Sequence, residues 1–212
     1  MSHTSRPAER GTQGPQGPLE VLLRAMEGPG DAGEPVVDPD MVALFEEFLG
    51  EAGSTEEAQV FHGATKPKGR PYHYVMRDTE QRGLCLHEGR LVATALQGAN
   101  NAQEEPISVV PNPVLERRRC PLIVGIRGGS HALSCGIGPE PQLKIEEVGL
   151  LDLFSRGPEA TPYTFYKTYG GSTHTFEAAA FPGRFLSTAL GPGEALTLAP
   201  PPDVTAFYLR RK

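Results

Sequence analysis

The stretch that decides the fold is YTFYKTYGGSTHTFEAAAFPGRFLSTAL, residues 163–190. Aromatic residues alternate along its first part as they do in a strand. Gly170-Gly171-Ser172 then predicts a turn, because glycine adopts positive φ without a clash at Cβ. Phe176 to Phe181 is a second apolar run, and Pro182-Gly183 predicts another turn before a further strand. The stretch contains no catalytic pattern, so it is interpreted as scaffold.

The rest of the chain from Tyr72 onward continues this pattern of short apolar runs separated by turn residues, which predicts an all-β domain. Only residues 148–154 could form a turn or two of helix. Three strand–turn–strand units are expected around Glu88-Gly89, Gly128-Gly129 and Pro182-Gly183, at spacings of 40 and 54 residues. Three such units suit a threefold closed β-architecture with few open edges. Spacing alone does not separate a trefoil from a sandwich.

The N-terminal part has a different composition. Residues 1–18 are rich in Gly, Pro, Ser and Gln without apolar periodicity, which predicts disorder. Short helices are expected over residues 19–26 and 40–50, the second with Asp40 as a possible cap and Gly50 as its end. The apolar face of this second helix comprises Met41, Leu44, Phe45, Phe48 and Leu49. Such a helix either folds weakly or docks on its own domain, which is preferred, or binds a groove on a partner.

Charge marks the same division. Residues 1–70 hold 6 Lys and Arg against 12 Asp and Glu, a balance of −6, whereas residues 71–212 hold 14 of each. A basic, turn-rich linker lies at residues 65–71. We therefore predict an acidic extension over residues 1–66 and one globular domain over residues 67–212. A neutral domain gives no global steering to nucleic acid or anionic membrane.

No run of about 18 apolar residues predicts membrane insertion. The N-terminus lacks an apolar core of the kind found in secretory signals, so we expect synthesis in the cytoplasm. The odd set of cysteines, Cys85, Cys120 and Cys135, predicts free, buried or partly buried thiols in a reducing compartment. Cys85 and His87 have no second ligand pair to complete a zinc site, so we expect neither a metal nor another cofactor.

The sequence does not predict an enzyme. None of the six histidines lies in a metalloprotease motif, and neither a nucleophile elbow nor a phosphate-binding loop occurs. Ser130-His131 is the one pair that suggests a nucleophile and a base. If both residues lie on a strand, their side chains point to opposite faces and cannot pair.

The run FEAAAFPGRFLSTA, preceded by Tyr163-Thr-Phe-Tyr166, resembles the signature of the interleukin-1 cytokine family. That signature pairs an aromatic strand with a segment of the form E-[SA]-A-A-[FYW]-P-G-W-F-[LI]. Arg184 stands where most members carry tryptophan, and Ser187 where many carry cysteine. The resemblance covers residues 72–209 and implies a β-trefoil of about twelve strands.

Within the family, local segments are similar to two receptor antagonists. Residues 91–98, followed by Glu104-Glu105 and residues 109–111, are similar to the interleukin-1 receptor antagonist. Residues 106–112 and 133–143 are similar to the interleukin-36 receptor antagonist. The resemblance thus implies a cytokine, secreted without a signal peptide, that occupies an interleukin-1-type or interleukin-36-type receptor ectodomain as an antagonist. An agonist activated by removal of the N-terminal segment is the alternative, and a glycan- or heparin-binding trefoil is a rival of another class.

The resemblance also implies a pro-segment and a processing protease. In the interleukin-36 group the mature start lies nine residues before a small-or-apolar-x-Asp motif. Met76-Arg77-Asp78 matches this motif and places the start near Lys66-Pro67, inside the basic linker. A disordered tail that is cleaved incidentally is the simpler alternative, because exposed linkers are cut readily.

Candidate receptor contacts follow from the positions that match the antagonist pattern, namely Gln81, Gln97 and Tyr208. Arg77 and Ala95 replace two aromatic contacts of that pattern, and Arg77 is kept as a fourth candidate. Gln81 could equally be a solvated turn residue, and Tyr208 a core residue with a hydrated hydroxyl. The basic clusters at residues 116–119 and 210–212 are interpreted as solvated segments, and no nucleic-acid partner is expected. We expect a monomer.

Overall fold

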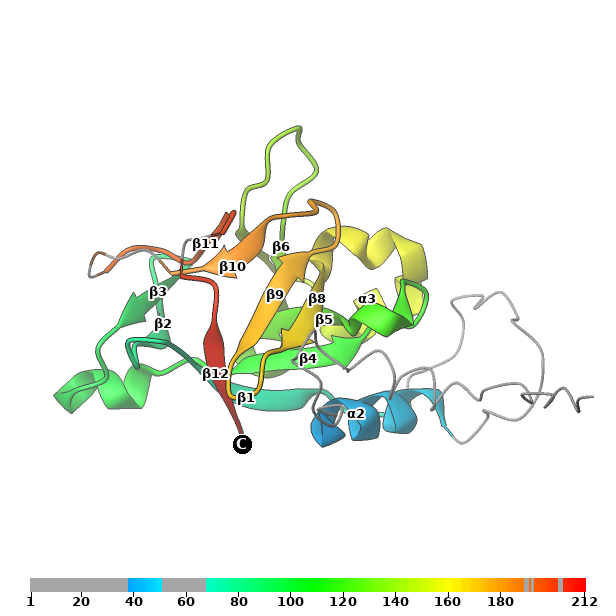
Figure 1. The fold of residues 1–212 in the computed structure, drawn as a ribbon, viewed down its shortest axis with the longest axis horizontal. Helices are drawn as coiled ribbons and strands as arrows, with labels where there is room; N and C mark the ends of the chain where they lie inside the picture. The colour runs from blue at the N-terminus through cyan, green and yellow to red at the C-terminus, as the bar shows by residue number, and fades with distance from the viewer. Residues whose placement is uncertain (1–37, 51–67, 189–190, 192, 202–203) are drawn as a thin grey trace, which may run out of the picture.

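Twelve strands joined in one sheet dominate the structure, a computed structural model that describes residues 38–50, 68–188, 191, 193–201 and 204–212 (Figure 1). Six strands close into a ring, because β12 pairs with β1 as well as with β9. The other ring pairs are β1–β4, β4–β5, β5–β8 and β8–β9. The ring strands are β1 (Tyr72–Asp78), β4 (Ile107–Pro111), β5 (Pro121–Ile126), β8 (Thr164–Tyr169), β9 (His174–Ala178) and β12 (Phe207–Arg211).

Three hairpins project from one end of this ring. They are β2–β3, β6–β7 and β10–β11, and in each the first strand pairs with the ring strand before it. The chain therefore repeats a four-strand unit three times, which is the β-trefoil that the sequence predicted. The hairpin strands are β2 (Gly83–His87), β3 (Arg90–Thr94), β6 (His131–Ser134), β7 (Lys144–Glu146), β10 (Phe185–Ser187) and β11 (Thr197–Ala199).

The three predicted strand–turn–strand units all form, but they are not equivalent within the threefold repeat. Glu88 and Gly89 connect β2 to β3 with φ of 49° and 75°, the geometry of a two-residue hairpin turn. Gly128-Gly129 and Pro182-Gly183 instead connect ring strands to hairpin strands, β5 to β6 and β9 to β10. The equivalent of these two in the first unit is the β1–β2 turn. The first of the three predicted units is therefore shifted by one strand relative to the other two.

The core fills the ring with large side chains from all three units. Phe165, Phe176 and Phe207 are fully buried, and the rings of Phe176 and Phe207 lie 6.5 Å apart. The opening stretch thus supplies two of these three anchors. Its first strand begins one residue later than expected, because Tyr163 closes a 3₁₀ segment instead of starting β8.

Among the described residues, helical elements are few, as expected. They are α2 (Pro39–Leu49), α3 (Leu150–Arg156) and the 3₁₀ segments η1 (Gly98–Gln103), η2 (Arg117–Arg119), η3 (Arg127–Gly129) and η4 (Gly157–Tyr163). The expected cap of α2 was wrong by two residues. Asp38 is the cap, since its side chain accepts from the Asp40 amide at 3.2 Å and Pro39 suits the first helical position. The disorder and helix predicted for residues 1–26 lie outside the described residues.

Helix α2 docks against the end of the ring opposite the three hairpins (Figure 1). Its side chains bond to Tyr72 at the start of β1, to Lys167 in the second half of β8 and to Arg211 at the end of β12. Met41, Leu44, Phe45 and Phe48 belong to the same buried cluster as the trefoil core. The helix therefore packs on its own domain, the preferred of the two interpretations of its sequence.

Candidate binding surfaces

Arg77 and Tyr208 are brought together by the β1–β12 ladder. They are directly paired in the antiparallel register, so their side chains emerge on the same face of the sheet. The Arg77 Nε atom lies 3.4 Å from the Glu104 Oε1 atom, which fixes the guanidinium along this face. Tyr208 is 37% exposed and is not a core residue. This pair is an exposed cationic and aromatic patch.

Gln81 lies in the β1–β2 turn, four residues after Arg77 of β1. Its φ is 65°, and its amide donates to the Asp78 carbonyl at 2.9 Å. Gln97 precedes η1, and the same connection ends at Glu104, the partner of Arg77. Both glutamine side chains are exposed. Among the described residues no hydrogen bond joins either of them to Arg77 or Tyr208, so the four candidates occupy neighbouring elements without forming one bonded cluster.

The Met76-Arg77-Asp78 motif has a structural role in the fold. Met76 and Asp78 are each 1% exposed. The Asp78 carboxylate accepts from the amides of Glu80 and Arg82, from the Arg82 Nε at 2.8 Å and from the Thr188 hydroxyl at 3.0 Å. It therefore ties the β1–β2 turn to the segment after β10. Lys66 and Pro67, the predicted cut, lie outside the described residues.

A second surface, missed at the sequence level, lies beneath α2. The Tyr72 hydroxyl donates to Glu47 at 2.7 Å, and the Tyr74 hydroxyl donates to Asp40 at 3.3 Å. Lys167 forms an ion pair with Asp38, and its side chain is 3% exposed. The Arg211 guanidinium lies 3.5 Å from the centre of the Tyr72 ring and 3.7 Å from Asp40. An acidic helix thus meets a surface of tyrosines and cations.

Burial changes the titration of groups near this surface. Burial raises the pKa of Tyr74 far above its ordinary value, and the nearby carboxylates of Asp40 and Asp38 add to the rise. Burial lowers the pKa of His174 to about 4, with Lys167 lowering it further and Asp38 opposing. Burial also raises the pKa of the Cys120 thiol to about 12. The cysteines are unpaired and buried, as predicted, and the high pKa makes Cys120 a poor nucleophile.

The sequence carried a partial signal for this surface. The apolar face of α2 and the acidic residues beside it were visible, and Tyr72 and Tyr74 alternate along a predicted strand. The sequence did not predict that Lys167 is buried, because a single lysine within a run of aromatic residues is typical of an exposed strand position. Only the pairing of β8 with β9 and β5 turns it toward Asp38.

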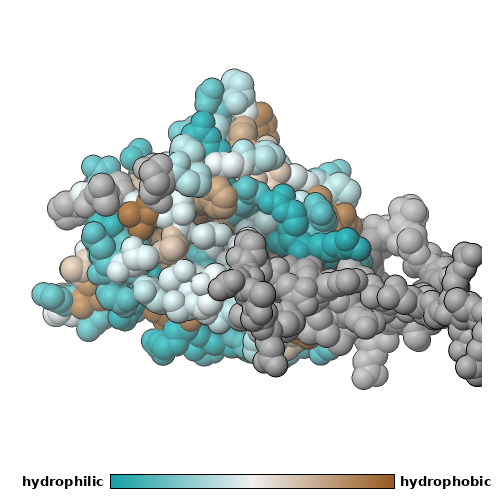
Figure 2. Space-filling model, in the orientation of Figure 1, coloured by the Kyte–Doolittle hydropathy of each residue, from teal (hydrophilic) through white to brown (hydrophobic). Residues whose placement is uncertain are grey.

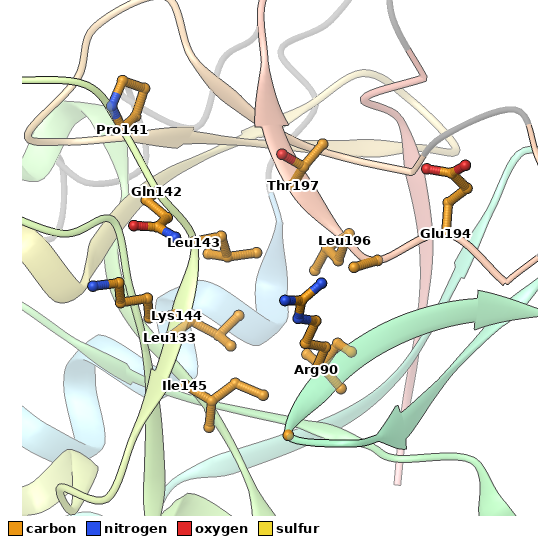
Figure 3. Close-up of a pocket in the computed structure, with 13 residues that line it drawn as sticks. Arg90, Leu133, Pro141, Gln142, Leu143, Lys144, Ile145, Glu194, Leu196 and Thr197 are labelled. Atoms are coloured by element: carbon orange, nitrogen blue, oxygen red, sulfur yellow. The ribbon is translucent and has the colours of Figure 1, made fainter.

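A groove opens where the three hairpins converge (Figure 3). It has a volume of about 730 Å³ and is lined by Leu91, Leu133, Leu143, Ile145 and Leu196, with Arg90, Gln142, Lys144 and Glu194 among its polar members. None of the described lining residues is aromatic. A sugar ring therefore has no aromatic side chain to stack on among these residues, and the groove does not support the glycan-binding alternative.

The basic cluster at residues 116–119 is held within the fold. Arg117 donates from Nε to the Pro113 carbonyl at 2.9 Å. Arg119 forms an ion pair with Glu177 and stacks over the Tyr166 ring, 4.1 Å from its centre. These two cations are already engaged, which argues against a free anion-binding patch.

Ser130 and His131 do pair, contrary to the expectation. Their side chains hydrogen-bond at 2.7 Å because β6 begins at His131 and Ser130 belongs to the turn before it, so strand alternation does not apply. The Ser130 hydroxyl also lies 3.1 Å from the Arg127 carbonyl. Within the described residues no carboxylate hydrogen-bonds the His131 ring, so a catalytic triad is not assembled. In the part of the chain that the structure describes, no helix is long and apolar enough to cross a membrane.

The closed ring with three hairpins defines a β-trefoil, and comparisons with known proteins place it in one family. A family model described as Interleukin-1 / 18 matches residues 96–207, more than half of the chain. The chain belongs to this cytokine family, as the resemblance predicted. The prediction that the protein is not an enzyme has support at the level of the family.

Individual relatives agree with this assignment. The human interleukin-36 receptor antagonist protein is 37% identical over 143 residues, covering 64% of this chain and 92% of that protein. The human interleukin-1 receptor antagonist protein is 36% identical over 162 residues, covering 71% and 89%. The crystal structure of chicken interleukin-1β matches with a TM-score of 0.58 at 27% identity, covering 66% of this chain and 96% of that one.

Proposed function

We propose that this protein acts outside the cell as an antagonist of an interleukin-1-type or interleukin-36-type receptor. The observation that carries the proposal is its similarity to two receptor antagonists over nearly their whole length, at 37% and 36% identity. The trefoil would occupy a receptor ectodomain through one side without recruiting a second receptor chain. Fold alone does not decide this, because one fold hosts several functions.

The exposed face of Arg77 and Tyr208 is the proposed centre of receptor contact, with Gln81 and Gln97 at its edge. Arginine and tyrosine are enriched among the residues that dominate protein–protein affinity. The guanidinium is only partly engaged by Glu104, at 3.4 Å, so it remains able to donate hydrogen bonds to a receptor carboxylate. Recruitment of a second chain would depend on loops elsewhere on the trefoil, such as residues 112–121.

We further propose that residues 1–66 form a removable acidic segment, cut near Lys66-Pro67 by a protease, and that residues 67–212 form the acting monomeric domain. Two features of the sequence support this division: the acidic excess of residues 1–70 and the basic linker at residues 65–71. The runner-up function is an agonist that this cut activates.

A reporter assay separates these functions. Cells bearing either receptor type receive the full chain or residues 67–212, alone and against a known agonist. Antagonism predicts silence alone and dose-dependent suppression of the agonist. A signal from residues 67–212 alone would establish the agonist instead.

The contact face is tested within the same assay. Arg77→Ala and Tyr208→Ala should each weaken suppression tenfold or more, whereas Glu88→Ala, in the exposed β2–β3 turn, should leave it unchanged. Equal potency of all three variants would exclude this face. Retention of the protein on a heparin resin at physiological salt, without receptor binding, would favour the glycan-binding rival.

A further inference from the structure

Helix α2 contacts the trefoil through side chains and is not paired with its sheet. The ring of six strands and the three hairpins close through strand pairs alone. Among the described residues, every hydrogen bond from α2 to the trefoil runs between side chains, through Tyr72, Tyr74 and Lys167. No backbone ladder would break if the helix left.

The contact is nonetheless well matched in shape. Met41, Leu44, Phe45 and Phe48 are each at most 5% exposed. The rings of Phe48 and Phe154 in α3 lie 5.1 Å apart. Gly69 leaves room for the Phe48 ring, since a Cβ at that position would lie 2.5 Å from it. One amphipathic face therefore fills a site made by β1, α3 and the segment that enters β1.

Charge is matched as well. Residues 38–50 contain Asp38, Asp40, Glu46 and Glu47 and no lysine or arginine, a net charge of −4. The trefoil meets them with Lys167, Arg211 and two tyrosine hydroxyls. If α2 departed, Lys167 would lose its only ion pair among the described residues, and Phe154 would lose its contact with the Phe48 ring.

Once uncovered, this site would expose apolar surface that α2 now buries. On the face seen in Figure 2, hydrophobic residues are scattered singly among hydrophilic ones. Removal of α2 would instead expose adjacent aromatic side chains beside two cations. Exposed apolar patches of this kind commonly mark protein-binding sites.

We infer that the trefoil face beneath α2, here called the base site, is a binding site for an acidic helix with aromatic anchors, and that α2 occupies it in the uncut chain. The inference rests on the proposed function for one step, the cut between α2 and the trefoil. After that cut, α2 competes with a partner protein that presents the same chemistry. The base site is distinct from the Arg77–Tyr208 face, since the two lie toward opposite ends of β1.

The test uses the full chain with a recognition sequence for a specific protease inserted within residues 51–67. The folded protein is cut, and association of the two fragments is followed by native mass spectrometry during dilution. A labelled synthetic peptide of residues 38–50 is then titrated onto the separated trefoil fragment. We expect the fragments to separate on dilution, the trefoil to stay folded by circular dichroism, and the peptide to bind saturably.

Matched variants test whether the peptide binds through the contacts seen for α2. Peptides carrying Phe48→Ala or Asp38→Asn, and trefoil carrying Lys167→Met, should each bind at least tenfold more weakly. A Glu46→Gln peptide should bind as the parent does, because Glu46 is exposed on the helix. Unlabelled parent peptide should displace the labelled one.

Three results would overturn the inference. The folded trefoil could fail to bind the peptide, it could unfold when α2 leaves, which would make α2 integral core, or it could dimerise through the uncovered base site, which would make a second copy the occupant. None of these measurements involves a receptor. Failure of antagonism in the reporter assay would therefore leave the base site intact, and the reverse also holds.

Discussion

The ammonium of Lys167 in β8 and the carboxylate of Asp38 at the start of α2 form a buried ion pair across 129 residues of sequence. The same carboxylate caps α2 through the Asp40 amide. One side chain therefore both starts the helix and fastens it to the trefoil. Formation of the helix and its docking on the base site are coupled through Asp38.

Asp38→Asn separates these two roles, since asparagine caps a helix as well as aspartate does but carries no charge. We expect the free energy of unfolding to fall by about 3–5 kcal/mol, because Lys167 is left buried without its partner. Urea denaturation measures the loss. The double variant Asp38→Asn, Lys167→Met should recover part of it. Glu46→Gln on the same helix should change stability by less than about 0.5 kcal/mol, and an equal effect of Asp38→Asn and Glu46→Gln would contradict this account.

The Asp78 carboxylate gives a second prediction, because it accepts four hydrogen bonds while 1% exposed. Asp78→Ala should lower the free energy of unfolding by about 3–5 kcal/mol, since Arg82 loses its buried ion pair with Asp78 and the amides of the β1–β2 turn lose their acceptor. Glu80→Ala is the control, because that carboxylate is 56% exposed and lies 3.6 Å from Arg82. Its loss should cost at most about 1 kcal/mol. Chemical denaturation measures both variants. Equal losses of unfolding free energy in Asp78→Ala and Glu80→Ala would show that Asp78 does not hold the turn.

This role of Asp78 explains why sequence reasoning reached the fold more securely than the site. Turn glycines and alternating apolar residues act locally, so an all-β domain, its turns and α2 were predictable from short segments, whereas the β-trefoil itself was implied by the family resemblance. The Met76-x-Asp78 motif was interpreted as a marker for processing. In the structure both side chains are buried, and Asp78 accepts a hydrogen bond from Thr188. That hydrogen bond joins residues 110 positions apart, so no local sequence pattern could predict it.

The shift of the first predicted unit has a similar cause. The β2–β3 turn and the β5–β6 turn both contain glycine at positive φ, so their local signals are alike. Only the pairing of β1 with β12 and β4 shows that the first unit begins at Tyr72. Lys167 and the Ser130–His131 contact were missed or misjudged for the same reason, since strand boundaries and distant partners decide where these side chains point.

Gly125 provides a third prediction, which rests on the lack of space for a side chain and not on the backbone conformation of glycine. A Cβ at this position would lie 2.2 Å from the His131 carbonyl oxygen and 2.7 Å from Leu150. Gly125→Ala should therefore destabilise the trefoil by about 3 kcal/mol or more, because a backbone atom cannot move aside within the β5–β6 ladder. Thermal unfolding checks this. Gly138→Ala, whose nearest neighbour would be 4.0 Å away, should unfold near the parent temperature, and a similar shift in both variants would refute the packing argument.

His174 predicts how stability depends on pH. The ring is 9% exposed, lies 5.0 Å from the Tyr169 ring, and has a pKa lowered to about 4 by burial and by Lys167, with Asp38 opposing. Between pH 6.5 and 4 the unfolded chain binds a proton at this site and the folded chain does not. The free energy of unfolding should therefore fall as the pH drops through this window, by up to about 3 kcal/mol from this one group.

The contribution of His174 is isolated by comparing urea unfolding of the parent and of His174→Phe at pH 7.5, 6, 5 and 4. Phenylalanine keeps the aromatic contact with Tyr169 and cannot take up a proton. The stability difference between parent and variant should thus shift steadily in favour of the variant below pH 6.5. The exposed His87→Gln should follow the parent at every pH. Parallel curves for the parent and His174→Phe would show that His174 becomes charged in the folded protein.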